Sequence, residues 1–281
     1  MSLKRVAVVT GSNKGIGLAI VRGLCKDFQG DVVLTARDEG RGRAAVQVLE
    51  KEGFSPKFHL LDISDHQSIV KLRDFLKETY QGLDVLVNNA AILYNEDSTL
   101  PFPDQARETI KVNYYNNLDV CEVLFPLLRP HARVCNMSSL ANAIAFKVLS
   151  PELRTKFLNP QITMPEVSSL MTQFVDAAQE NKHEEQGFFL SRVSSYGISK
   201  IGLTLMSAIQ QRDFDAQGAV DIVVNSCSPG YVNTDMTQGK GPLTVEEGAV
   251  TPLYLCLLPP DVSGPRGLFI REKAIYDWTT T

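Results

Sequence analysis

Short apolar runs alternate along the chain with longer segments in which apolar residues recur every three or four positions. The runs are rich in Val, Leu and Ile and alternate little with polar residues, which is typical of strands buried on both faces of a sheet. Six such runs lie at 5–10, 31–36, 57–61, 83–87, 133–137 and 221–226, and a weaker seventh lies at 267–270. We therefore expect about seven strands.

The periodic segments between these runs predict amphipathic helices. They cover 15–28, 38–52, 65–80, 105–129, 195–217 and 244–258, and Asp65 is a typical N-cap residue for the third. Regular strand–helix alternation favours right-handed crossovers and a parallel sheet. The predicted fold is an α/β, Rossmann-type, doubly wound parallel sheet with helices on both faces, which binds its ligand at the carboxyl ends of the strands.

One segment interrupts this alternation between the fifth strand and the helix that starts near Ser195. About 50 residues, 141–193, contain no strand pattern. Ser150-Pro151 and Thr163-Met164-Pro165 resemble helix starts, and apolar residues follow at helical spacing. We interpret 141–193 as a mostly helical insertion within a single catalytic domain spanning 1–281.

Composition narrows the possible functions. The formal net charge is −4, which argues against nucleic-acid binding, and 44% of the residues are hydrophobic, which suits a packed core. The four histidines and five cysteines form no HExxH or CxxC pattern, so neither a metal site nor a disulfide framework is expected. No apolar run reaches the length of a membrane span, and a strand-like run begins almost at once, with no signal-peptide pattern. We expect a reduced, cytoplasmic protein without membrane or nucleic-acid partners.

A glycine-rich loop follows the first strand and opens the first helix. It consists of Thr10 followed by Gly11, Ser12, Asn13, Lys14, Gly15, Ile16 and Gly17. Glycines let a backbone approach a pyrophosphate closely, and the free N–H groups of a helix N-terminus face the anion. An ordinary glycine-rich turn is the alternative, but the strand before and the helix after favour dinucleotide binding.

The end of the second strand indicates which dinucleotide binds. NAD sites usually carry an acidic residue there, whereas this chain has Arg37, with Arg41 one turn later and Lys14 in the glycine loop. These cations suit the 2′-phosphate of NADPH/NADP+. Asp38 is a counter-signal because it could pair with Arg41, and the arginines could also be solvated residues at a helix start.

The candidate chemistry lies farther along the chain. Tyr196 and Lys200 are four residues apart, so both would project from one face of a helix. Taken alone, a Tyr and a Lys four residues apart are most often two surface residues of a helix without a catalytic role. It gains weight because Ser139 follows the fifth strand, whose carboxyl end would open onto the same crevice.

Five ordered motifs resemble the classical short-chain dehydrogenase/reductases. They are TGSNKGIG at 10–17, NNAA at 88–91, NMSS at 136–139, YGISK at 196–200 and SPGYVNTDM at 228–236. The likeness runs from about residue 5 to 270. The 57-residue separation of Ser139 and Tyr196 is similar to that of the monomeric cytosolic carbonyl reductases. The resemblance therefore implies NADPH-dependent reduction of carbonyl compounds to alcohols.

The resemblance also implies catalytic roles. Tyr196 would be the general acid, and Lys200 would favour its phenolate and hold the nicotinamide ribose. Ser139, rather than Ser138, would orient the substrate carbonyl. Asn113 would hold a water that links Lys200 to solvent. Without the resemblance, a structural Asn inside a helix would be the better interpretation of Asn113.

Further contacts follow from the same resemblance. The remaining cofactor-binding residues would be Asp62, Ile63, Asn89, Pro229, Gly230, Val232, Thr234, Asp235 and Met236, together with Tyr196 and Lys200. The substrate would meet Ser139, Tyr196, Tyr94, Ala141 and Tyr231. Asp62 could instead be a helix cap, and the substrate wall could be surface packing. Ala91, Tyr231 and Ser228 depart from the usual family residues, and we expect Cys227 to face away from the site.

The expected activity covers aldehydes, ketones and quinones, with steroid, pterin and prostaglandin carbonyls as further possibilities. A regulatory NADP-binding protein with little turnover is one alternative, and a sugar-nucleotide epimerase is another. We expect a monomer, because the insertion would cover an apolar row on the Tyr196 helix. The row is Ile201, Leu205 and Ile209 with Arg212 beyond it, and the covering residues are Leu170, Phe174, Val175 and Ala178.

Overall fold

One eight-stranded sheet forms the centre of the computed structural model, which describes residues 4–95, 97–189, 191 and 194–280. The strands are β1 (Val6–Val9), β2 (Asp31–Ala36), β3 (Lys57–Leu60), β4 (Leu83–Asn88), β5 (Leu128–Met137), β6 (Val223–Ser228), β7 (Phe269–Arg271) and β8 (Ala274–Ile275). They run in the order β3-β2-β1-β4-β5-β6-β7-β8, and every neighbouring pair is parallel except β7 and β8. The seven expected strands are confirmed. The two-residue β8 is too short to give a pattern in the sequence.

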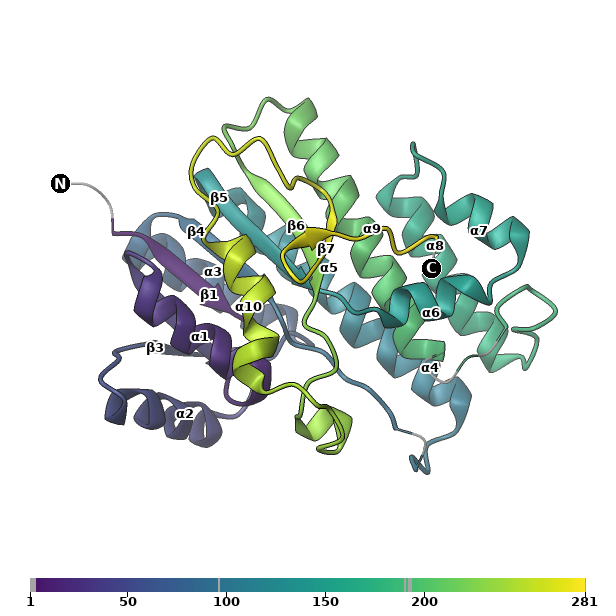
Figure 1. Ribbon diagram of the computed structural model, residues 1–281, viewed down its shortest axis with the longest axis horizontal. Helices are drawn as coiled ribbons and strands as arrows, with labels where there is room; N and C mark the ends of the chain where they lie inside the picture. The colour runs from purple at the N-terminus through teal and green to yellow at the C-terminus, as the bar shows by residue number, and fades with distance from the viewer. Residues whose placement is uncertain (1–3, 96, 190, 192–193, 281) are drawn as a thin grey trace.

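Helices cover both faces of this sheet (Figure 1). One face carries α1 (Gly15–Asp27), α2 (Glu39–Lys51) and α10 (Val245–Cys256), and the other carries α3 (His66–Tyr80), α5 (Asn116–Leu124) and α9 (Ser194–Ala216). Successive residues of β1 point to opposite faces, with Ala7 and Val9 on the α1 side and Val6 and Val8 on the α3 side. All four are fully buried. The doubly wound fold expected from the unalternating apolar runs is therefore confirmed.

The segment expected as one helix over 105–129 is divided, so that prediction was wrong in detail. It contains α4 (Phe102–Ile110), a π-helical turn η1 (Lys111–Tyr115), α5 and a short 3₁₀ turn (Phe125–Leu127), after which β5 begins. Pro126 has no N–H for a helical hydrogen bond, which explains why regular helix stops near it. Apolar spacing alone does not reveal a π turn, because the turn adds one residue without changing which residues are buried.

The insertion is mostly helical where the structure describes it, as expected. It forms α6 (Ala141–Lys147), α7 (Pro151–Phe157) and α8 (Met164–Gln179), while its last residues, 190 and 192–193, lie outside the described part. Ser150 caps α7, and Thr163 with Glu166 forms a capping box for α8. In Figure 1 these helices gather at the right of the sheet, where the C-terminal segment also ends.

The insertion packs on the helix that carries Tyr196. The two apolar rows share one core cluster, whose members include Ile201, Leu205 and Ile209 of α9 and Leu170, Phe174, Val175 and Ala178 of α8. Arg212 extends this contact, because its guanidinium donates to the carbonyls of Pro160, at 3.0 Å, and Ile162, at 2.7 Å. Within the described residues, each helix is too short or too polar to cross a membrane.

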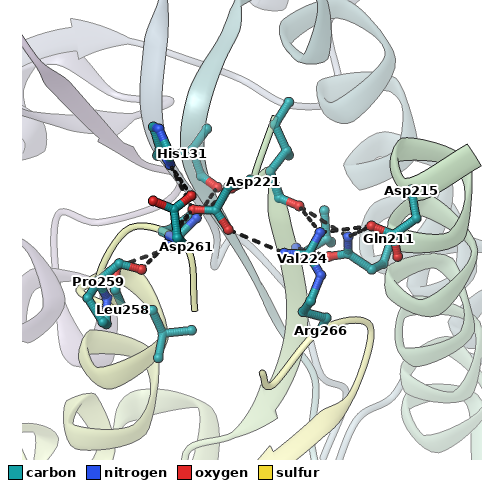
Figure 2. Close-up of polar contacts among 12 residues, drawn as sticks. His131, Gln211, Asp215, Asp221, Val224, Leu258, Pro259, Asp261 and Arg266 are labelled. Atoms are coloured by element: carbon teal, nitrogen blue, oxygen red, sulfur yellow. Dashed lines mark hydrogen bonds and ion pairs between the residues drawn. The ribbon is translucent and has the colours of Figure 1, made fainter. Parts of the chain in front are cut away.

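A buried ion-pair network holds the opposite end of the sheet from the glycine loop. Asp221 is 7% exposed and lies 2.9 Å from both the Arg133 guanidinium and His131 Nδ1 (Figure 2). It also accepts from the Asp261 N–H at 2.7 Å and pairs with Arg266 at 3.3 Å. His131, Asp221 and Asp261 are close enough to hold a metal ion. However, two guanidinium groups already neutralise Asp221, so we interpret the cluster as structural.

Candidate active site

The loop between β1 and α1 packs closely against the segment that follows β4. Gly11 has a φ of +59°, and a Cβ there would lie 2.9 Å from the Cβ of Ala90. At Gly17 a Cβ would lie 2.6 Å from Nδ2 of Asn89. Because a side chain at either position would clash, glycine is required. The close approach leaves the N-terminus of α1 open toward the cleft beside it.

Two polar side chains fix this loop. Ser12 is fully buried; its hydroxyl donates to the Val9 carbonyl at 2.8 Å and accepts from the Thr35 N–H at 3.0 Å. Asn89 donates its amide to the Thr10 carbonyl at 2.9 Å. The Ser12 hydroxyl therefore holds the loop against β2 instead of facing a ligand, whereas Asn89 both holds the loop and lines the cleft.

A cleft of about 1100 Å³ opens at the carboxyl ends of β1, β2 and β4. Most of the expected cofactor residues line it, namely Gly11, Asn13, Lys14, Gly15, Ile16, Gly17, Arg37, Arg41, Asp62, Ile63, Asn89, Thr234, Asp235 and Met236. Asp38 and Ala91, which the sequence had singled out, line it as well. The lining residues that were not anticipated are Leu61, Ser64, Ala90, Ile92, Leu93, Asn95, Val112, Asn233, Gln238, Gly239 and Val245. Most of these are neighbours of expected residues in the same strand-end loops. Val112 carried no signal, because it reaches the cleft from the π turn.

The three expected cations all lie at this cleft, but they differ in their ion pairs with neighbouring residues. Arg37 is exposed and has no ion pair with any described residue. Arg41 lies 3.5 Å from Asp38, whose carboxylate caps α2 by accepting the Arg41 N–H at 2.8 Å. That backbone hydrogen bond, followed by the Arg41 charge, lowers the pKa of the Asp38 carboxyl. Lys14 pairs with Asp235 at 2.7 Å. A glycine cradle with three cations at its rim fits a phosphorylated dinucleotide.

The Asp62 carboxylate does not cap α3. It accepts the Ser64 N–H at 2.9 Å within its own turn, and Asp65 caps the helix by accepting the Gln67 N–H at 3.0 Å. The alternative interpretation of Asp62 as a helix cap is therefore wrong, because the cap lies three residues later. Asp62 and Ile63 both line the cleft.

The loop after β6 closes another side of the cleft. Thr234, Asp235 and Met236 line it, whereas Pro229, Gly230 and Val232 do not. Gly230 has a φ of +85°, which favours glycine. Val232 is 2% exposed and forms a β-bridge with Leu243, so it supports the loop from behind. These three expected cofactor residues are thus placed in the same loop but not on the described wall of the cleft.

Tyr196 and Lys200 lie together near the start of α9. Lys200 is 2% exposed; its Nζ donates to the Met137 carbonyl at 2.6 Å and lies 5.2 Å from the centre of the Tyr196 ring. Burial lowers the pKa of Lys200 to about 7. Burial also raises the pKa of Tyr196 to about 12, although a hydrogen bond with the Ser139 hydroxyl acts in the opposite direction. The tyrosine is therefore a phenol near neutral pH, with a serine and a lysine beside it.

The two serines after β5 face different neighbours. Ser138 is 2% exposed, donates to the Lys200 carbonyl at 3.1 Å and lies 2.7 Å from the Thr204 hydroxyl. Ser139 is only partly buried, and its hydroxyl reaches Tyr196. The geometry thus leaves Ser139, and not Ser138, facing the tyrosine.

Asn113 lies on the π turn and is fully buried. Its side-chain amide donates to the Ile92 carbonyl at 2.9 Å and to the Ser199 hydroxyl at 3.1 Å, and its Oδ1 accepts the Ile92 N–H at 2.8 Å. Asn113 therefore ties the cleft wall at Ile92 to the helix that carries Tyr196. Its backbone carbonyl accepts from the Asn117 side-chain amide at 3.1 Å, so the side chain and the carbonyl both already have hydrogen-bond partners.

The residues expected to contact the substrate differ in how exposed their side chains are. Tyr231 is 53% exposed and Tyr94 is partly buried, but Ala141 is only 5% exposed and offers little surface. Cys227 is fully buried, with its Sγ 3.6 Å from that of Cys135. Ala91, which stands where glycine is usual in the family, lines the cleft.

Comparisons with known proteins identify relatives of this chain. A family model described as short chain dehydrogenase matches residues 5–151. Carbonyl reductase (NADPH) 1 of Homo sapiens is 52% identical over 274 residues, which is 97% of this chain and 98% of that protein. Carbonyl reductase (NADPH) 3 of Mus musculus is 49% identical over 278 residues, 99% of both chains. Among solved structures, salutaridine reductase from Papaver somniferum is 30% identical with a TM-score of 0.84, covering 95% of this chain and 99% of its own.

Proposed function

The chain belongs to the short-chain dehydrogenase family, and we propose that it reduces small-molecule carbonyl compounds to alcohols with NADPH. Aldehydes, ketones and quinones are the proposed substrate classes, with steroid, pterin and prostaglandin carbonyls as further candidates. One observation carries the proposal: Ser139, Tyr196 and Lys200 meet just beyond the carboxyl end of β5. Asn113 connects this group to the cleft that fits the dinucleotide.

In the proposed reaction, NADPH supplies the hydride when it is bound. The glycine loop and the N-terminus of α1 would hold its pyrophosphate, and Arg37, Arg41 and Lys14 would hold its 2′-phosphate. Ser139 would donate a hydrogen bond to the substrate carbonyl and orient it. Tyr196 would donate its Oη proton to the carbonyl oxygen, because burial keeps the phenol protonated near neutral pH.

Lys200 would support this proton transfer electrostatically. A cation beside Tyr196 favours the phenolate that remains after donation. With a pKa of about 7, Lys200 is partly protonated near neutral pH and can exchange a proton there. In the proposed relay, a water held by Asn113 would carry protons between solvent and Lys200.

A turnover assay tests the proposed function. We expect NADPH oxidation, followed by its absorbance at 340 nm, in the presence of a quinone or an aromatic aldehyde, with the alcohol or hydroquinone as product. Tight NADPH binding without turnover on any member of such a panel would contradict carbonyl reduction and favour the regulatory alternative.

Cofactor preference gives a sharper prediction. NADPH should be preferred over NADH at least about tenfold in kcat/KM, because each charge-assisted bond to the 2′-phosphate contributes about 1.5–3 kcal/mol. Arg37→Asp should reduce or reverse this preference, since Arg37 is unpaired among the described residues and lines the cleft.

The matched control for that prediction is Arg43→Asp. Arg43 lies on the same helix as Arg41 but is exposed, pairs with Glu39 at 2.7 Å and does not line the cleft. Its substitution should leave the preference unchanged. Equal efficiency of the unmodified enzyme with NADPH and NADH would overturn the assignment of the three cations.

We propose that the protein is a monomer. α8 buries the apolar row of α9, so the row that would otherwise invite a second subunit is already covered within the chain. Sedimentation equilibrium at micromolar concentration should give about 31 kDa. Deleting 143–185 should expose the row and cause association or insolubility. A stable oligomer of the full chain joined through α9, or a soluble monomeric deletion variant, would each contradict the covering role.

We also propose a cytoplasmic location. The five cysteines are free thiols, including Cys135 and Cys227, whose sulfur atoms lie 3.6 Å apart. Free thiols this close are expected in a reducing compartment. Cell fractionation should recover the protein with cytosolic markers, and recovery with organelles would contradict this assignment.

A further inference from the structure

Thr204 joins the loop that carries Ser139 to the helix that carries Tyr196 and Lys200. Its hydroxyl donates to the Lys200 carbonyl at 2.8 Å, lies 2.7 Å from the Ser138 hydroxyl and accepts from the Asn142 amide at 3.1 Å. Thr204 is 5% exposed, Ser138 2% and Asn142 0%. Two buried polar side chains, Ser138 from the turn after β5 and Asn142 from α6, therefore meet the hydroxyl of Thr204 on α9, directly behind the candidate active site.

Three hydrogen-bond partners surround the hydroxyl oxygen of Thr204. A threonine hydroxyl has one proton and two lone pairs. The Thr204 and Ser138 hydroxyls both lie within hydrogen-bond distance of the Lys200 carbonyl and 2.7 Å from each other, so one of them donates to the carbonyl while the other donates to its neighbour, and Thr204 also accepts from the Asn142 amide. Ser138 and Asn142 flank Ser139 on both sides in sequence, so these bonds hold the loop in place on each side of that serine.

We propose that Thr204 is a positioning residue for the reduction, because it sets where Ser139 stands relative to Tyr196. This inference rests on the proposed function. Thr204 would not touch substrate or cofactor. It would act through residues 138–142, which comprise the turn after β5 and the start of α6. The Ser139 and Tyr196 hydroxyls, which must both reach one carbonyl oxygen, would then be correctly placed before the substrate arrives.

The hydroxyl of a threonine inside a helix often donates a hydrogen bond only to the backbone carbonyl four residues earlier, and such a bond indicates no functional role. Ser207, one turn later on α9, provides that comparison. It donates to the Leu203 carbonyl at 2.9 Å and accepts from the Asn136 amide at 2.9 Å. Ser207 is as buried as Thr204, but its partner lies within strand β5 and not among residues 138–142. Ser207→Ala is therefore a matched structural control.

The kinetic test compares four variants. Thr204→Val keeps the shape but removes the hydroxyl, and we expect kcat to fall about 10- to 100-fold, since misplacement by 1 Å can cost this much. KM for NADPH should be unchanged. Thr204→Ser should restore most of kcat, and Ser207→Ala should retain it. Asn142→Ala breaks the bond from the loop side and should also lower kcat, so the test does not depend on the folding of Thr204→Val.

A second readout is independent of turnover. The Asn142 N–H bonds to the Ser139 carbonyl at 3.0 Å, and the Ala143 N–H bonds to Asn142 Oδ1 at 2.6 Å. Hydrogen exchange at these two amides should accelerate about tenfold or more in Thr204→Val, but not in Ser207→Ala. Wild-type kcat and unchanged exchange in Thr204→Val would overturn the positioning role. An inactive wild-type protein would instead overturn the proposed function, and the exchange result would still report on the loop.

Discussion

Replacing Tyr196 with phenylalanine should lower kcat by about 10²–10⁴-fold while leaving NADPH affinity nearly unchanged. The substitution removes the hydroxyl that Ser139 contacts but changes the side-chain volume little. General acid catalysis typically accelerates a reaction by about 10²–10⁴-fold, which sets the expected loss of kcat. Steady-state kinetics with an aromatic aldehyde, together with fluorescence titration of NADPH, would measure both quantities. Retention of more than half of the activity would mean that another group supplies the proton.

One control and one further variant make that result specific. Tyr276→Phe removes a hydroxyl from a tyrosine of the C-terminal segment, which packs on Phe269 away from the cleft, and should leave kcat unchanged. Lys200→Met should also lower kcat, because it removes the charge that favours the Tyr196 phenolate. It should weaken cofactor binding as well, if Lys200 holds the nicotinamide ribose as proposed.

Replacing Asp221 with alanine should lower the free energy of unfolding by about 3–5 kcal/mol, as expected when one partner of a buried ion pair is removed. The cause is Arg133, which is 2% exposed and would lose the carboxylate 2.9 Å away. Urea denaturation followed by circular dichroism would measure the change. Asp261→Ala is the control: its side chain is 79% exposed, and its backbone N–H still reaches Asp221. A loss below 1 kcal/mol for Asp221→Ala would contradict this account.

The same network predicts how stability depends on pH. Burial would raise the pKa of Asp221, but the hydrogen bonds from Arg133 and His131 outweigh it and lower that pKa to about 2. A carboxyl with a depressed pKa stabilises the folded state above its unfolded pKa, near 3.9, and that contribution is lost as the pH falls through about 2. This contribution to the free energy of unfolding corresponds to about 3 kcal/mol. The stability difference between wild type and Asp221→Asn should therefore shrink between pH 4 and pH 2.

Most of the fold could be predicted from local pattern, because strands buried on both faces and amphipathic helices leave unmistakable periodicities. The boundaries of β2 were predicted without error. The π turn at 111–115 could not be predicted, since it preserves the buried face of the helix. The Asp221 network was also invisible. Arg133 and Asp221 are 88 residues apart, and nothing in either local sequence indicates that the two will meet.

In the candidate site, too, some residues could be predicted from local sequence and others could not. The cleft residues that were predicted belong to motifs at strand ends, where the topology alone brings them together. Ser138 and Ser139 could be separated only by the resemblance to a family, until the contacts with Lys200 and Tyr196 gave a physical reason. Thr204 was missed because its role depends on partners more than 60 residues away in the chain.

The central claim is that this chain passes hydride from NADPH directly to a carbonyl carbon. Reduction of an aromatic aldehyde with NADPH that carries two deuterium atoms at C4 of the nicotinamide tests it most directly. The account predicts that wild type forms an alcohol with one deuterium on the carbinol carbon. In Tyr196→Phe the rate of formation of this alcohol should fall by the same factor as kcat. An alcohol formed at the wild-type rate without deuterium on that carbon, or no alcohol at all, would contradict the account.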